Sequence, residues 1–126
     1  MKTAAQLTLE EIADYQASAR RRHKQEQYRL RLREEHAWEL ARRAASLLRE
    51  QFGATRVMVF GSLVHRDSFT PWSDVDIAAW GIRPDYTLQA IGAVMDISPD
   101  IELNLVDVNT CSPDFGAAIE REGTDI

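Results

Sequence analysis

Residues 57–80 read VMVFGSLVHRDSFTPWSDVDIAAW, and this segment joins two apolar runs through a polar loop. The first run, TRVMVF at residues 55–60, is rich in β-branched residues and predicts a buried strand. Gly61 and Ser62 end that strand, and the second run, DVDIAAW at residues 74–80, predicts another. The segment therefore predicts two strands of one sheet, with polar side chains where the chain passes between them.

The rest of the chain completes an α/β pattern. Residues 9–52 contain neither glycine nor proline and are mostly good helix formers, so we predict a helix that Thr8 caps at its start and Gly53 at its end. The other predicted elements are a short helix, a third strand and a last helix, at residues 85–94, 101–108 and 113–122. We expect an α/β fold: a small mixed sheet of about three strands, flanked by helices and preceded by a long N-terminal helical extension.

The long predicted helix has an uneven apolar pattern. Residues 37–52 carry apolar side chains at helical spacing and should pack on the domain. Residues 16–27 are almost wholly polar, so we expect either a break near them or a projecting arm. We accordingly divide the chain into an N-terminal helical arm, residues 1–36, and a domain of residues 37–126. The apolar side chains of the arm would serve a partner protein or a homo-oligomer.

Composition and charge argue against several classes of protein. No apolar run approaches the roughly 18–20 residues that cross a bilayer, the N-terminus lacks the apolar core of a signal peptide, and the single cysteine fits a reducing compartment. We therefore expect a cytoplasmic protein without a membrane segment. Residues 1–52 carry 11 Lys and Arg against 8 Asp and Glu, whereas residues 53–126 carry 4 against 12. Such an acidic region would repel a bare polyanion, so nucleic-acid binding is not expected.

Two pairs of residues indicate the chemistry. A glycine at the end of a strand lets the backbone approach a ligand closely, and free N–H groups in a turn after Gly61 would favour an anion, to which Ser62 adds a hydroxyl. Asp74 and Asp76 are two residues apart, so both face the same side of a strand, with Cα atoms about 6.5 Å apart. Carboxylates in that arrangement can share hard cations such as Mg²⁺. Each pair alone is common, but together they indicate a site for a magnesium-bound phosphate compound.

The segment at residues 57–80 resembles the signature of the polymerase-β-type nucleotidyltransferase superfamily, and more narrowly that of its small stand-alone branch, the minimal nucleotidyltransferases or MNT proteins. The hallmark of that signature is a hydrophobic strand, Gly-Ser, about ten residues and Asp-x-Asp. The later segment VDVNTCSPDFGAAIEREG, residues 106–123, resembles the closing strand and helix of the family. The resemblance covers residues 40–126 and implies the nucleotidyltransferase fold.

The resemblance also implies roles for single residues. It implies a nucleotide-binding set made of Gly61, Ser62, Arg66 and Ser73. It implies that Asp74 and Asp76 ligate magnesium, with two ions when the nucleotide is bound. An ion pair with Asp67 is the alternative role for Arg66.

The chain departs from the family pattern at the third carboxylate, which the family carries on a later strand. Asn104 stands at that position, and its amide can ligate a metal through its oxygen but brings no charge and cannot act as a base. Glu102 lies two residues earlier, on the same strand face, and could supply the missing carboxylate. Asp107 lies three residues after Asn104, so in a regular strand its side chain faces the opposite side. The catalytic set implied by the resemblance is therefore Asp74 and Asp76 together with Glu102 or Asn104.

Stand-alone MNT proteins are typically antitoxins paired with a HEPN toxin, and some adenylylate a tyrosine of that toxin. The resemblance thus implies a magnesium-dependent antitoxin that transfers AMP from ATP to a HEPN-type protein partner. Two alternatives stay open. One is a catalytically impaired module that binds a partner through its N-terminal helix, and the other is a nucleotidyltransferase that acts on a small molecule.

Overall fold

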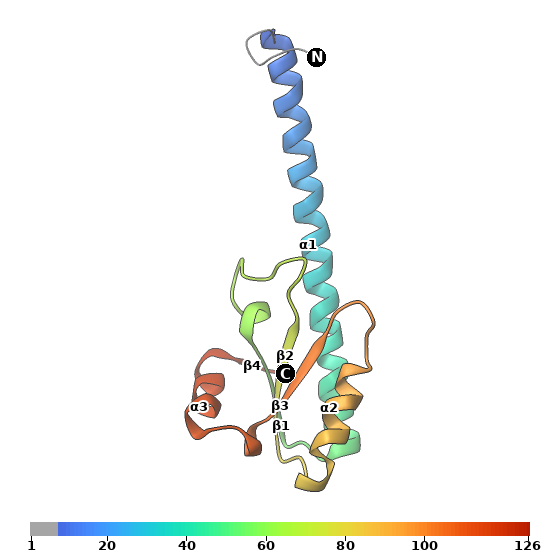
Figure 1. Ribbon diagram of the computed structural model, residues 1–126, viewed down its shortest axis with the longest axis vertical. Coiled ribbons are helices and arrows are strands. Elements are labelled where there is room, and N and C mark those ends of the chain that lie inside the picture. Colours follow the sequence, from blue (N-terminus) through green and yellow to red (C-terminus); the bar gives the residue numbers. More distant parts are fainter. Residues whose placement is uncertain (1–7) are drawn as a thin grey trace. The chain divides into compact units, whose positions relative to one another are not determined.

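A computed structural model describes residues 8–126 of the chain. The helices and strands in chain order are α1 (Leu9–Phe52), β1 (Arg56–Phe60), β2 (Val75–Trp80), α2 (Thr87–Met95), β3 (Leu103–Asp107), α3 (Pro113–Glu122) and β4 (Thr124–Asp125) (Figure 1). Short 3-10 turns follow β1, precede α2 and follow β3, at Gly61–Val64 (η2), Pro84–Tyr86 (η3) and Val108–Thr110 (η4). The expected α/β class with a long N-terminal helix is confirmed. None of the helices in residues 8–126 is long and apolar enough to cross a membrane.

Helix α1 begins and ends at the predicted caps. The Thr8 hydroxyl accepts a hydrogen bond from the Glu11 backbone N–H at 3.1 Å, which satisfies one of the free donors of the first turn. At the other end Gly53 has a φ of 73°, a left-handed conformation that glycine adopts without strain. The helix is continuous through residues 16–27, so the break that their polarity suggested is wrong. Good helix formers without glycine or proline keep this stretch helical.

The chain divides into two compact units between Leu32 and Arg33. In the first unit the described residues form helix only, and several of their large apolar side chains are exposed: Leu9, Ile12, Tyr15, Tyr28 and Leu32. The second unit holds the rest of α1 and the whole sheet. In that part of α1 one stripe of side chains is buried, at Ala37, Leu40, Ala41, Ala44, Ala45 and Leu48. The predicted packing of residues 37–52 on the sheet domain is therefore confirmed.

The sheet has four strands in the order β3-β2-β1-β4, rather than about three. Strands β1 and β2 are antiparallel, with Phe60 opposite Asp76, and β2 and β3 are parallel, with Asp76 opposite Asn104. Figure 1 shows α3 on one face of this sheet, and the second-unit part of α1 together with α2 on the other. Because neighbouring residues of a strand face opposite sides, Asp76 and Asn104 lie on the α3 face, as do the buried side chains of Met58 and Ala78.

Asp107 lies on the opposite face of the sheet from Asn104, as predicted from their separation of three residues along the strand. It is the buried charged residue of the described core, with 3 % of its surface exposed. Its carboxylate accepts hydrogen bonds from the Thr87 hydroxyl at 2.7 Å and from the Asn109 backbone N–H at 3.2 Å. These bonds satisfy the buried oxygens and tie the start of α2 to the end of β3, so Asp107 has a structural role.

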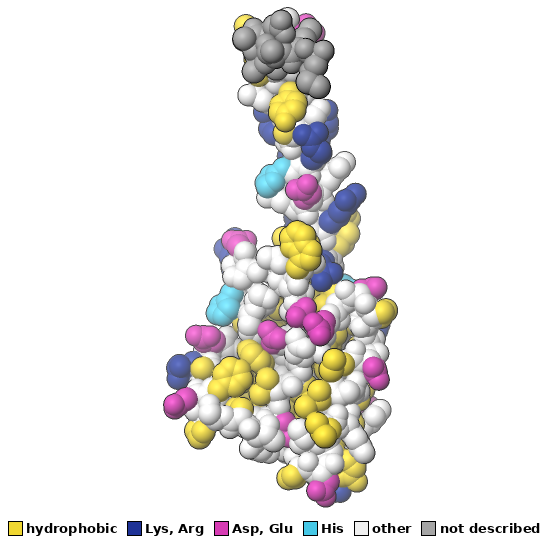
Figure 2. All heavy atoms as spheres, viewed as in Figure 1, with side chains coloured by type: hydrophobic (Ala, Val, Ile, Leu, Met, Phe, Trp, Pro, Cys, Tyr) yellow, Lys and Arg dark blue, Asp and Glu magenta, His cyan; other side chains and the backbone are white. Residues whose placement is uncertain are grey.

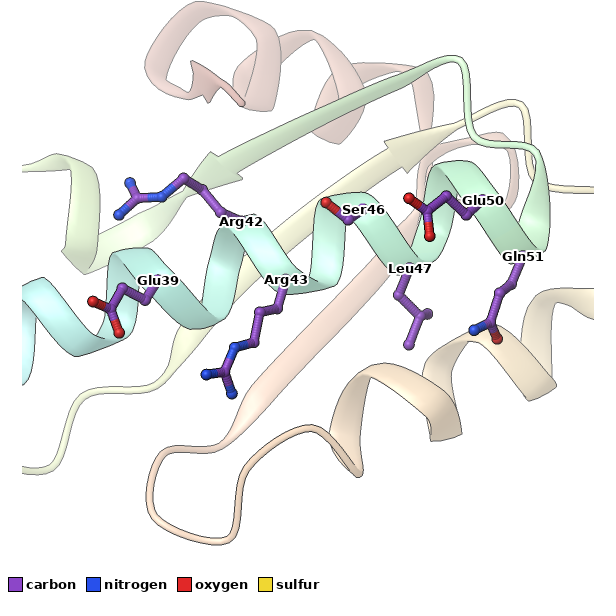
Figure 3. Close-up of a pocket in the computed structure, with 7 residues that line it drawn as sticks. All are labelled: Glu39, Arg42, Arg43, Ser46, Leu47, Glu50 and Gln51. Atoms are coloured by element: carbon purple, nitrogen blue, oxygen red, sulfur yellow. The ribbon is translucent and has the colours of Figure 1, made fainter.

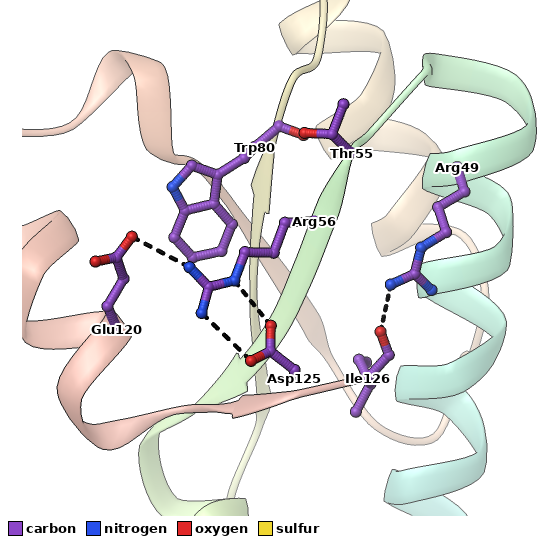
Figure 4. A network of polar contacts seen from close by, with 7 residues as sticks. All are labelled: Arg49, Thr55, Arg56, Trp80, Glu120, Asp125 and Ile126. Atoms are coloured by element: carbon purple, nitrogen blue, oxygen red, sulfur yellow. Dashed lines mark hydrogen bonds and ion pairs between the residues drawn. The ribbon is translucent and has the colours of Figure 1, made fainter.

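Strand β4 was not predicted, and contacts between distant parts of the chain hold it in place (Figure 4). Arg56 stacks over the Trp80 ring at 4.9 Å, while its Nε donates to Asp125 at 2.8 Å and its Nη1 to Glu120 at 3.3 Å. In the same region Arg49 donates to the carbonyl oxygen of Ile126. A strand of two residues has no periodicity that could reveal it in the sequence.

Replacing Asp125→Asn should loosen β4. The hydrogen bond from Arg56 lowers the pKa of Asp125. A carboxylate with a depressed folded-state pKa contributes stability above its unfolded value, about 3.9, and loses it as the pH falls through the folded value. The Ile126 backbone N–H donates to Val57 and reports on this edge of the sheet. We expect its hydrogen exchange to be faster in the variant than in the wild type at neutral pH, with a difference that shrinks in acid.

The matched control is Asp85→Asn, which makes the same chemical change at an exposed residue outside the sheet. Equal exchange rates of the Ile126 amide in wild type and Asp125→Asn at neutral pH would contradict the role given to the Arg56 pair.

Candidate functional site

Two carboxylates and one amide meet at the N-terminal end of strand β2. Asp74 directly precedes β2 and Asp76 belongs to it, so their side chains leave the same face. The Asn104 Nδ2 atom lies 3.5 Å from Asp74 Oδ2 and 3.5 Å from Asp76 Oδ1. Both are long hydrogen bonds, and they place one amide between two carboxylates. The parallel register of β2 and β3 brings Asn104 to this point, since it sets Asn104 directly opposite Asp76.

The Gly61 backbone lies against the same carboxylate cluster. Gly61 opens η2 with a φ of 79°, a left-handed conformation. A Cβ atom built at this position would lie 2.6 Å from Asp76 Oδ2, closer than non-bonded heavy atoms approach. Both the backbone conformation and the neighbouring carboxylate therefore favour glycine at this position. The Gly61-Ser62 turn and the aspartates, which the sequence separates by eleven residues, form one site.

The negative charges of Asp74 and Asp76 are not neutralised by a cationic side chain of the described residues. Burial raises the pKa of Asp76, the hydrogen bond from Asn104 opposes that rise, and the charge of Asp74 adds to it. None of the ion pairs between residues 8–126 involves Asp74 or Asp76. Figure 2 shows acidic side chains gathered at the centre of the visible face of the second unit. Two half-buried negative charges that face a single neutral amide favour the binding of a cation.

The donor set of the site suits a hard divalent cation. Two carboxylates supply charged oxygens, and a half-turn of the Asn104 amide would present its Oδ1 in place of Nδ2. Among the residues that the structure describes, no group of three or more His, Cys, Asp and Glu side chains is arranged to hold a metal ion. Glu102 therefore does not join the two aspartates in such a group. Its side chain is exposed, and its backbone oxygen accepts a hydrogen bond from Val75 N at 2.9 Å.

The other residues assigned to nucleotide binding differ in their placement. Ser62 follows Gly61 in η2, and Gly61 is the residue whose backbone lies against Asp76. Ser73 directly precedes Asp74, but its hydroxyl is engaged locally, since it accepts a hydrogen bond from Thr70 N at 2.8 Å. Arg66 is exposed in the loop after η2, and within the described chain no hydrogen bond or ion pair connects it to the aspartates or to Asp67.

Sequence reasoning missed Arg33. Its Nη2 donates to the backbone oxygen of Ser73 at 3.3 Å, and its guanidinium lies over the Phe69 ring, 5.9 Å from the ring centroid. Arg33 is one of many arginines in α1, and the sequence contains no signal that pairs it with a loop forty positions later. The contact depends on how the second-unit part of α1 packs beside the loop that precedes β2.

Two surface hollows of the second unit lie elsewhere. A shallow hollow of about 660 Å³ runs along α1 and is lined by Glu39, Arg42, Arg43, Ser46, Leu47, Glu50 and Gln51. In Figure 3 Leu47 and Gln51 point toward α2, while Arg42 points away from it. A second hollow, of about 550 Å³, lies beyond the opposite ends of β1 and β2, beside Gly53, Gly81 and Tyr86. Neither contains the aspartates or Asn104, so charges and donor atoms define the site, and not one of these two hollows.

Replacing Gly61→Ala should disturb both the fold and the site. The added Cβ meets Asp76 Oδ2, and alanine at a φ of 79° is strained, so we expect a loss of more than about 1 kcal/mol in the free energy of unfolding. The displaced carboxylate should also shift the NMR signals of the Asn104 side-chain amide. The matched control is Gly92→Ala in α2, where a Cβ meets nothing within 4 Å and alanine favours the helix. A Gly61→Ala protein as stable as wild type, with unchanged Asn104 signals, would contradict the close approach.

Replacing Asp76→Asn should stabilise the protein in the absence of divalent cations. A carboxyl group whose folded-state pKa is raised above its unfolded value opposes folding when it is ionised. The variant should therefore melt at a higher temperature than wild type at neutral pH. The difference should shrink as the pH falls through the raised pKa, and it should vanish below about pH 4, where the acid is protonated in both states.

Thermal unfolding from pH 4 to pH 8 in the presence of a chelator measures this effect, with the exposed residue change Asp85→Asn as control. A lower melting temperature for Asp76→Asn than for wild type at neutral pH would show that Asp76 is not electrostatically strained.

Models of known protein families do not match this chain, and a search of curated proteins finds no significant match either.

Proposed function

We propose that this chain is a nucleotidyltransferase-type protein that binds a magnesium–nucleoside triphosphate at Asp74, Asp76 and the Gly61-Ser62 turn. One observation carries the proposal. The carboxylates of Asp74 and Asp76 converge on one amide, next to a backbone turn whose conformation favours glycine, and no cationic side chain of the described residues pairs with them. A site built in this way favours a cation and an anion together, as in a metal-bound triphosphate.

The residues present fit magnesium. Asp74 and Asp76 would hold it, and Asn104 could add its amide oxygen. When bound, magnesium would neutralise the charge of the phosphate oxygens and polarise the phosphorus that is attacked. The raised pKa of Asp76 agrees with such a role, because a cation removes the repulsion between the two carboxylates.

The Gly61-Ser62 turn would hold the triphosphate. The absence of a side chain at Gly61 lets the phosphate chain approach the backbone, and the Ser62 hydroxyl can donate a hydrogen bond to a phosphate oxygen. In nucleotidyl transfer an acceptor hydroxyl forms a bond to the α-phosphorus, the α–β bridging bond breaks, and pyrophosphate leaves. The residues would contribute by positioning and by charge. The nucleotidyltransferase fold is part of the same proposal, as are ATP as the donor and an antitoxin that modifies a HEPN-type protein.

A binding module is the second candidate, and two observations favour it. The third member of the cluster is an amide instead of a carboxylate, and the described residues hold no three-carboxylate group. In the first unit, Leu9 and Tyr15 of α1 are 87 % and 71 % exposed, which gives a partner protein or a second copy an apolar surface. In this reading the chain binds nucleotide without transferring it and acts by docking on its partner.

Incubation with labelled ATP and Mg²⁺, with and without the protein encoded by the neighbouring gene, separates the two candidates. We expect the wild type to transfer label to that protein, and the control variant Asp85→Ala, which changes an exposed residue outside the site, to do the same. Asp74→Ala should reduce the transfer by at least about a hundredfold, because a ligand to the reacting complex is lost.

The same samples also show the results that would contradict the proposed transfer. Nucleotide binding without transfer would favour the binding module, and transfer that appears only in Asn104→Asp would show that the amide blocks catalysis. Absence of any magnesium–nucleotide binding to the wild type would contradict both candidates.

A further inference from the structure

The loop in front of Asp74 is ordered by a small set of contacts. Thr70 and Ser73 form a tight turn, in which Ser73 N donates to Thr70 O at 3.1 Å and the two hydroxyl oxygens are 3.0 Å apart. Phe69 anchors the start of the turn, since only 2 % of its surface is exposed. The loop connects η2 to β2, so it sets where the chain enters the site.

Arg33 is the residue of α1 that holds this loop. Its Nη2 donates to Ser73 O at 3.3 Å and its guanidinium covers Phe69 at 5.9 Å, so it contacts both ends of the turn. The Arg33 Nε is buried and has no hydrogen-bond partner. A buried donor without a partner is unfavourable for folding. The contacts of Arg33 therefore indicate a role beyond stability.

That role follows from the chemistry of the peptide group. The carbonyl of Ser73 belongs to the peptide unit that enters Asp74, and a fixed carbonyl fixes the plane of that unit. On the other side of Asp74, Val75 N donates to Glu102 O at 2.9 Å. Asp74 is thus held between two anchored peptide units. Arg33 forms no ion pair with either aspartate among residues 8–126, so it acts on them through the backbone.

We propose that Arg33 is a positioning residue: by binding Ser73 O and covering Phe69, it directs the Asp74 carboxylate toward Asp76 and Asn104. The consequence for metal affinity rests on the proposed function, whereas the consequence for the geometry of the carboxylate cluster does not. Through Arg33 the second-unit part of α1 is in this way coupled to the site.

Arg33→Met tests the proposal without removing the packing, because methionine keeps an unbranched apolar stem over Phe69 but cannot donate to Ser73. Arg33→Lys keeps a donor and a positive charge and should restore part of the effect. The matched control is Arg42→Met on the same helix, since Arg42 is exposed and lines only the shallow hollow along α1.

The first readout needs no ligand. In NMR spectra of the metal-free protein we expect Arg33→Met to accelerate hydrogen exchange of the Ser73 amide and to shift the Asn104 side-chain amide signals. Arg33→Lys should fall between Arg33→Met and wild type, and Arg42→Met should match wild type. The melting temperature of Arg33→Met should stay close to that of wild type, because the buried unpartnered Nε is removed together with the hydrogen bond.

The second readout is the affinity for Mn²⁺, a paramagnetic substitute for Mg²⁺ that is measured by water-proton relaxation. Loss of a residue that orients a metal ligand typically weakens metal binding by about 10- to 100-fold, so we expect at least about a tenfold loss in Arg33→Met and a smaller one in Arg33→Lys.

Three results would overturn the proposal. The first is an Arg33→Met protein in which the Ser73 amide exchange rate and the Asn104 signals equal those of wild type. The second is a faster Ser73 exchange with an unchanged affinity for Mn²⁺. The third is an Arg33→Met protein that does not fold, which would make the role structural. A wild type that binds no Mn²⁺ would contradict the proposed function instead, and the metal-free spectra would still decide whether Arg33 directs the cluster.

Discussion

The pairing register of β2 with its two neighbours is the constraint on which the site depends. Antiparallel pairing sets Phe60 opposite Asp76, and parallel pairing sets Asn104 opposite Asp76 on the other side. A shift of either register by one residue would turn the side chains of one strand to the opposite face of the sheet, so that the partners of Asp76 would no longer meet it. The same registers place Met58 and Ala78 in the core against α3, so the packing of that face holds the site in register.

The site combines features that oppose stability with a fold that tolerates them. Two like charges approach one another, one of them with a pKa raised by burial, beside a glycine in a left-handed conformation. Polar and strained groups of this kind are typical of functional sites, where binding a ligand offsets their energy. The buried carboxylate of Asp107 is the contrast, because hydrogen bonds satisfy it and the sheet separates it from Asn104.

Much of the local structure could be predicted from the sequence, because the relevant interactions are short in range. The Thr8 cap bonds a residue three positions on, and so does Ser112, whose hydroxyl accepts from Phe115 N at 3.2 Å. The shared direction of Asp74 and Asp76 follows from the two-residue period of a strand and is confirmed by their common contact with Asn104. The polarity of residues 16–27 could not decide between a break and a projecting arm, since it indicates solvent exposure and does not break a helix.

By itself the sequence determined the succession of helices and strands and the face that each side chain takes, because backbone periodicity and capping act within a few residues. The tertiary structure alone decided which faces meet. It placed Gly61 against Asp76, gave Asn104 both carboxylates as partners, added β4 through Arg56, and brought Arg33 to Ser73. These contacts join residues far apart in the chain, and they form only when strand register and helix packing are set together by the burial of one core.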